Sequence, residues 1–199
     1  EGEKGYTSFP EGADLKGKIA VVLRFEPMNE NGESRWADVR WSVNAGLDSK
    51  LRAAAERGAS AVILVNAPGA HDDRVNKLED LTLSGGRPLK IPVVMMSIPA
   101  ADAMIKAADE QGRSLMDLRK LADEAGGVID LPRVAAQVKV DMERVPLKTD
   151  NVGGILPGVG DLAKEYVVIG SHYDHVGYGF FGSRSGAAGR GKIHAGADD

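Results

Sequence analysis

Three short apolar runs, separated by helix-forming segments, constrain the fold of this chain most strongly. The runs occupy residues 16–24, 59–66 and 91–97, and each is bounded by glycine, proline or charged residues. Runs of this length and composition are typical of strands buried in a sheet. Residues 47–58 are rich in strong helix formers and end at Gly58, a residue type that commonly terminates helices. The alternation predicts an α/β domain.

Two further helices are expected after the third run. Residues 100–112 follow Pro99, which suits the first turn of a helix because its backbone nitrogen carries no hydrogen to leave unpaired. Residues 114–127 begin with Ser114, a favoured N-cap, and contain Gly126 at the expected end. Helices therefore follow the third strand as well as precede the second.

Both tryptophans lie in a polar segment, residues 25–41, that carries proline and glycine and is predicted to be a loop. Two interpretations of Trp36 and Trp41 are open. They could form a platform for a ligand, or they could cover an edge of the core. We expect the second, because large aromatic side chains in loops commonly pack against a core.

The pattern changes after about residue 132. Residues 133–145 alternate apolar and polar side chains, as a half-exposed antiparallel strand does. Residues 151–161 suggest a strand and a turn, and residues 165–172 form a nearly continuous apolar run that is typical of a strand buried on both faces. We therefore predict one complete α/β domain at residues 1–133 and the opening strands of a second α/β domain at residues 134–199.

Composition limits the function classes. The chain has 199 residues, no cysteine and a formal net charge of −4, so it gives no reason to expect binding to nucleic acid or to a membrane surface. No run approaches the roughly 20 apolar residues that a membrane-spanning helix needs. Without cysteine, disulfides and thiolate metal sites are excluded. Any metal would have to be held by His, Asp or Glu.

The densest group of reactive side chains is the segment SHYDHVG at residues 171–177. His172 and Asp174 are two residues apart at the end of the predicted buried strand, so in extended backbone they share a face. A carboxylate beside an imidazole fixes its tautomer and raises its basicity, as in many zinc sites. The alternative is a histidine at a strand end with an aspartate in a turn, and the pair alone does not exclude it.

A second group of carboxylates, Asp198 and Asp199, follows a glycine-rich segment. One carboxylate can bridge two metal ions, and two metals about 3.5–4 Å apart are a recurrent device for activating water. An Asp-Asp pair in a solvated turn is the alternative interpretation of this group by itself.

Three segments in order, NVGGILPG, EYVVIGSHYDHVG and GADD, resemble the start of the catalytic domain of co-catalytic zinc aminopeptidases. This family includes leucyl aminopeptidases, glutamate carboxypeptidase and the glutaminyl cyclases. The resemblance implies two zinc ions, with His172 as a terminal ligand of one and Asp199 as the bridge between them. It implies that Asp174 is the catalytic-site carboxylate that orients His172. His175 and His194 match no ligand position and are expected to be loop residues.

The first 133 residues resemble a protease-associated (PA) domain through the strand at residues 16–24, the helix leading into ERGASAVILVN, and IPVVMMS. PA domains are commonly inserted in, or placed before, such catalytic domains and have no catalytic residues of their own. The resemblance implies a wall that shapes substrate access, or a surface for contact with another protein. It also implies a secreted or periplasmic location.

Together the resemblances imply the amino-terminal portion of an exopeptidase that hydrolyses amino-terminal residues from peptide substrates by metal-activated water. The family supplies a Glu-Glu pair, a further Asp and a distant His after the bridging aspartate, and the chain stops before them. One His and one carboxylate fall short of the three protein ligands of a catalytic zinc, so we expect these 199 residues alone to be inactive. Two alternatives are a non-catalytic PA interaction module, as in receptor-like relatives, and a glutaminyl cyclase-like enzyme.

Overall fold

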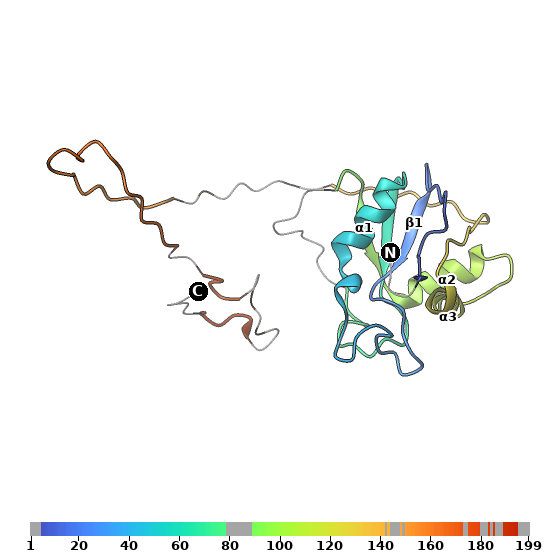
Figure 1. Cartoon of the computed structure of the whole chain (residues 1–199). Helices are drawn as coiled ribbons and strands as arrows, with labels where there is room; N and C mark the ends of the chain where they lie inside the picture. The colour runs from blue at the N-terminus through green and yellow to red at the C-terminus, as the bar shows by residue number, and fades with distance from the viewer. Residues whose placement is uncertain are drawn as a thin grey trace. The chain divides into compact units, whose positions relative to one another are not determined.

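The computed structural model describes residues 5–78, 89–141, 143, 148, 150–172, 175–179, 183, 185 and 189–194 (Figure 1). Residue contacts divide the chain into two units, Glu1–Met142 and Glu143–Asp199. Each unit is described separately. The sequence analysis placed the end of the PA-like domain at residue 133 and the start of the catalytic domain at residue 134, and this boundary stays a prediction.

A three-stranded parallel sheet forms the centre of the first unit. Its strands are β1 (Ile19–Leu23), β2 (Ala61–Val65) and β3 (Val93–Met96), in the order β1-β2-β3. The register pairs Ile19 with Ala61 and Val62 with Val93. All three strands fall inside the apolar runs at residues 16–24, 59–66 and 91–97, so the sequence prediction of these strands is confirmed.

Helices connect and follow the strands. A short 3-10 helix, η2 (Val43–Ala45), and helix α1 (Leu47–Glu56) lie between β1 and β2, as a parallel pair requires a crossover. After β3 come α2 (Ile98–Ala108) and α3 (Leu115–Ala125). These elements confirm the predicted helices and establish the α/β class.

The two faces of the sheet bury different side chains, because successive residues of a strand point to opposite sides. On one face, Leu51 and Ala54 of α1 pack with Val62 of β2. On the other face, Ile105 of α2 packs with Ile63. Figure 1 shows α1 on one side of the sheet and α2 with α3 on the other. Every residue of β2 is buried, as expected of a central strand covered on both faces.

The ends of α3 follow the predicted capping pattern. The Ser114 hydroxyl accepts a hydrogen bond from the backbone N–H of Asp117, and the Asp117 carboxylate accepts one from the backbone N–H of Ser114. Gly126 ends the helix with φ of 69°. A Cβ atom there would lie 2.0 Å from the carbonyl oxygen of Thr7, so this close approach requires glycine.

The strands predicted after residue 132 are not formed in the part of the chain that the structure describes, where no residue beyond Met96 belongs to a strand. In the run at residues 165–172, Val167, Val168 and Ile169 are 90–93% exposed. A strand needs a neighbouring strand to satisfy its backbone N–H and C=O groups. The apolar pattern alone was therefore not sufficient to predict a strand here.

Candidate functional site

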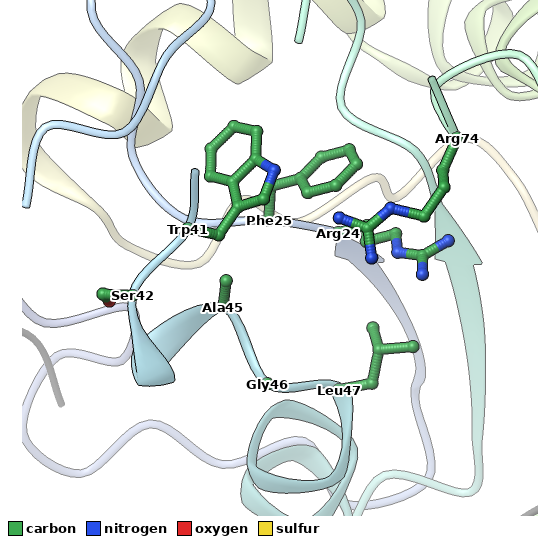
Figure 2. Close-up of a pocket in the computed structure, with 8 residues that line it drawn as sticks. All are labelled: Arg24, Phe25, Trp41, Ser42, Ala45, Gly46, Leu47 and Arg74. Carbon is green, nitrogen blue, oxygen red and sulfur yellow. The ribbon is translucent and has the colours of Figure 1, made fainter. Parts of the chain in front are cut away.

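Polar and aromatic side chains gather where the parallel strands β1 and β2 end. They surround a pocket of about 430 Å³ in the first unit (Figure 2). Ligands of open α/β sheets commonly bind at the carboxyl ends of strands. The lining residues come from the segment after β1, the loop after β2, η2 and the start of α1: Arg24, Phe25, Trp41, Ser42, Ala45, Gly46, Leu47 and Arg74.

The residues immediately after β1 place a cation and an aromatic ring in the pocket wall. The backbone N–H of Arg24 donates to the carbonyl of Val65 at 2.8 Å, which extends the β1–β2 pairing by one residue. The Arg24 side chain is buried. Phe25 then turns the chain with φ of 71°, and its ring stacks on Trp41 with centroids 4.5 Å apart and planes inclined by 22°. This turn fixes the ring between the strand end and the loop.

Arg74 reaches the pocket from the loop after β2, where Asp72 holds its guanidinium. The two Arg74–Asp72 contacts, Nε to Oδ1 and Nη2 to Oδ2, are each 2.7 Å. The indole N–H of Trp41 also donates to Asp72 Oδ2 at 2.7 Å. The hydrogen bond from Arg74 is the main reason that the pKa of Asp72 lies well below its usual range. One carboxylate thus links a pocket cation to the pocket indole.

The buried side-chain amide of Asn66 also holds the loop after β2. The side-chain nitrogen of Asn66, directly after β2, donates to the carbonyls of Arg74, Val75 and Lys77 at 2.8–3.0 Å. Because three carbonyls converge on one amide group, the backbone of the loop is fixed where Arg74 enters the pocket.

A buried carboxylate organises the other side of the pocket. Glu26 accepts hydrogen bonds from the hydroxyl of Ser34, from the backbone N–H of Ser42 at 2.7 Å, and from the hydroxyl of Ser42. The charge of Glu26 acts electrostatically on the amino group of Lys50 in α1. Burial lowers the pKa of Lys50, and the negative charge of Glu26 opposes that shift. Glu26 therefore links the start of the loop between β1 and α1 to two later positions of the same loop, Ser34 and Ser42.

The chemistry of this pocket is suited to binding. Its lining residues in the described part of the chain include two arginines but no Asp, Glu, His, Lys or Cys. The hydroxyl of Ser42 donates to the carboxylate of Glu26. The two guanidinium groups and the aromatic stack favour recognition of a ligand.

The predicted zinc residues lie in the second unit. His172 is exposed and ends the apolar run at residues 165–172, which lies outside helices and strands. Asp174 and Asp199 lie outside the described residues. Among the residues with a described placement, no three metal-ligating side chains come together. Imidazole and carboxylate are the donor types that zinc accepts, but the described residues supply only the imidazole, so the zinc set stays a prediction.

Two other histidines of the second unit contact backbone oxygens. His175 Nδ1 lies 3.3 Å from the carbonyl oxygen of His194, and His194 Nε2 lies 3.1 Å from that of Gly189. Their ring centroids are 6.2 Å apart. Both residues lie outside helices and strands.

The sequence patterns did not predict the pocket that contains Arg24 and Arg74, called the arginine pocket below. The rule that ligands bind at strand ends would have pointed to Arg24, which ends the first apolar run. Arg74 lies in a polar loop and gives no signal of its own. Trp41 was expected to cover an edge of the core, and it does pack against the cluster around Phe25, Met28 and Ala67, while also lining the pocket.

Comparison with known families gives one match. The model of the PA domain family matches residues 2–104, about half of the chain. This range contains the sheet and every residue of the arginine pocket, and it excludes His172. PA domains are typical of protease-associated proteins. No curated protein and no solved structure matches the chain. No helix in the described residues is long and apolar enough to span a bilayer.

Proposed function

Because this chain belongs to the PA (protease-associated) domain family, we propose that its first unit contacts peptides or proteins on behalf of a peptidase. We propose further that the chain is the amino-terminal portion of a two-zinc exopeptidase that removes amino-terminal residues from peptides. The location that goes with this activity is secreted or periplasmic.

One observation carries the peptidase proposal. The segment EYVVIGSHYDHVG is followed by GADD, and both come after a PA domain, which is the order found in co-catalytic zinc aminopeptidases. Either motif alone has an ordinary structural explanation. Their order behind this particular domain is what favours an enzyme.

The exposed apolar segment of the second unit agrees with this proposal. Val167, Val168 and Ile169 are 90–93% exposed and precede His172 directly. In a complete catalytic domain, neighbouring strands would bury these side chains and hold His172 at the carboxyl end of a strand. Exposed runs of this kind are costly in water and are expected to have a partner.

The residues of this chain have defined roles in the proposal. His172 and Asp199 would hold zinc, and Asp174 would orient the His172 ring. Zinc, when bound, supplies a water molecule with a pKa near neutrality. The general base and the remaining ligands would come from sequence beyond residue 199.

A second candidate is a binding module without peptidase activity. It is favoured by the pocket in the first unit, which has the chemistry of a binding site. A glutaminyl cyclase-like enzyme would use the same ligands mostly with a single zinc. The sequence beyond residue 199 discriminates between these candidates, since the peptidase needs the Glu-Glu pair, Asp and His.

The test uses a longer form of the protein that extends through the catalytic domain. We expect zinc-dependent release of nitroaniline from aminoacyl-4-nitroanilides, and a loss of at least about 100-fold in kcat/KM in His172→Ala and Asp199→Asn. His71→Ala is the matched control, because this exposed histidine lies in the first unit. Unchanged activity in both ligand variants would refute the site assignment, and cyclisation of amino-terminal Gln without nitroanilide hydrolysis would favour the cyclase.

A further inference from the structure

We infer that the pocket at the ends of β1 and β2 binds a carboxylate group of a peptide, through Arg24 and Arg74. This inference rests on the proposed role of the first unit in contacting peptides. It names the chemical group of the peptide that is recognised, a carboxylate, and the two residues that bind it.

The two guanidinium groups converge on one wall of the pocket. The guanidinium carbon of Arg24 lies 5.5 Å from the centroid of the Phe25 ring, and that of Arg74 lies 5.2 Å from the same centroid. Figure 2 shows the two groups beside each other next to Phe25. Cation–π attraction to the ring helps to hold both positive charges there. The two guanidinium groups offer N–H donors suited to an anion, while the carboxylate of Asp72 offsets part of their positive charge.

Arginine recognises carboxylates particularly well. Its planar fork matches the two oxygens of a carboxylate, and such pairs are stronger than hydrogen bonds between neutral groups. Arg74 already makes a paired contact of this kind with Asp72, with both distances 2.7 Å. Because Arg24 is only 6% exposed, a ligand that reaches it leaves bulk water, and the attraction is screened less.

The rest of the lining favours a peptide over a small inorganic anion. The volume of about 430 Å³ is much larger than a carboxylate or phosphate group needs. Trp41, Ala45 and Leu47 provide aromatic and aliphatic surface that can pack against the side chain next to the bound carboxylate.

The carboxylate could come from the carboxyl terminus of a peptide or from an Asp or Glu side chain. Three acetylated peptides distinguish these sources: acetyl-Ala-Ala-Ala-Leu with a free carboxyl terminus, the same peptide amidated, and acetyl-Ala-Glu-Leu-amide. Binding to the 199-residue chain is followed by fluorescence of Trp41, in a Trp36→Phe background so that the signal comes from the pocket. Inorganic phosphate serves as the competing anion.

We expect a carboxylate-bearing peptide to bind at least about tenfold more tightly than the neutral amide, and more tightly than phosphate. Arg74→Gln is expected to weaken that binding about tenfold or more. Since Arg74→Gln also removes the contact with Asp72, Ala45→Leu provides a second test that fills the pocket and leaves the charges in place. Lys120→Gln is the matched control, because it removes an exposed positive charge from α3 of the same unit.

Affinities no higher for the free-carboxyl peptide and the Glu-containing peptide than for the neutral amide would overturn the inference while leaving peptide contact by this unit intact. Tighter binding of phosphate than of any peptide would overturn it in favour of an inorganic-anion site. Full retention of binding in both Arg74→Gln and Ala45→Leu would also overturn it. The hydrolysis assay of the longer protein is independent of these results, so failure of the pocket and failure of the peptidase proposal are distinguishable.

Discussion

Replacing Glu26 with alanine removes the acceptor that links the start of the β1–α1 loop to Ser34 and Ser42. Glu26 is 4% exposed and accepts from the Ser34 hydroxyl, the Ser42 backbone N–H and the Ser42 hydroxyl. After the substitution, the buried Ser34 hydroxyl loses this acceptor and a cavity forms at the side chain. Ser42 is only partly buried, so water can replace part of what it loses.

The size of the effect follows from these contacts. Hydrogen bonds to charged groups contribute about 1.5–3 kcal/mol each, and rehydration of Ser42 reduces their sum, so we expect Glu26→Ala to lower the free energy of unfolding by about 3 kcal/mol. Glu26→Gln keeps one oxygen for Ser34 and the Ser42 N–H, and its amide nitrogen can donate to the Ser42 hydroxyl. The charge and the acceptor of the Ser42 hydroxyl proton are lost, but no cavity forms and Ser34 keeps its acceptor, so we expect a cost of about 1 kcal/mol for this variant.

Urea denaturation followed by tryptophan fluorescence measures both values, since both tryptophans lie in the first unit. Glu30→Ala is the matched control, because Glu30 is an exposed glutamate of the same loop. It should change the free energy of unfolding by less than about 0.5 kcal/mol. The reasoning is refuted if Glu26→Ala is as mild as the control, or if Glu26→Gln costs as much as Glu26→Ala.

Three further predictions concern the first unit. The guanidinium of Arg113 lowers the pKa of Asp109 to about 2, from an ordinary value of 3.8. The folded state therefore favours the ionised carboxylate, and its stabilisation is complete above about pH 5 and is lost as the pH falls towards 2. Urea denaturation should show Asp109→Asn to be less stable than wild type at pH 6, with the difference nearly gone at pH 2; an unchanged difference would contradict this. Ser114→Ala removes the N-cap hydroxyl of α3 and should lower the free energy of unfolding by about 1 kcal/mol in the same assay, and an unaltered midpoint would argue against the cap. Gly32 has φ of 77°, and a Cβ atom there would lie 2.0 Å from a backbone oxygen. Thermal unfolding should therefore show a larger loss for Gly32→Ala than for Gly112→Ala, which has φ of 65° but open space, and equal losses would contradict the close approach.

Most of the first unit could be predicted from the sequence because its signals are local. The apolar runs that became β1, β2 and β3 are short and bounded by breakers, and Ser114 and Gly126 mark the two ends of α3. Local hydrogen bonds and backbone conformations of this kind are determined within a few residues. A strand after residue 132 depends instead on a partner strand, and an apolar pattern does not say whether that partner is present.

The arginine pocket shows what sequence patterns leave out. Arg24 and Arg74 are 50 positions apart in numbering, and they meet at one ring only because β1 and β2 are adjacent and parallel. Asn66 and Asp72 fix the loop that carries Arg74 through contacts that no short motif encodes. The zinc motifs have the opposite character. They can be recognised in the amino-acid sequence, whereas the structure describes only His172 of the three predicted site residues.

Zinc content is the sharpest test of whether this chain joins a PA domain to the start of a two-zinc site. The measurement compares the 199-residue chain with a longer form that extends through the catalytic domain, after dialysis against zinc-free buffer, by elemental analysis of zinc per protein molecule. We expect two tightly held zinc ions in the longer form and none held stoichiometrically by the 199 residues. Stoichiometric zinc in the 199-residue chain, or a longer form without zinc, would contradict it.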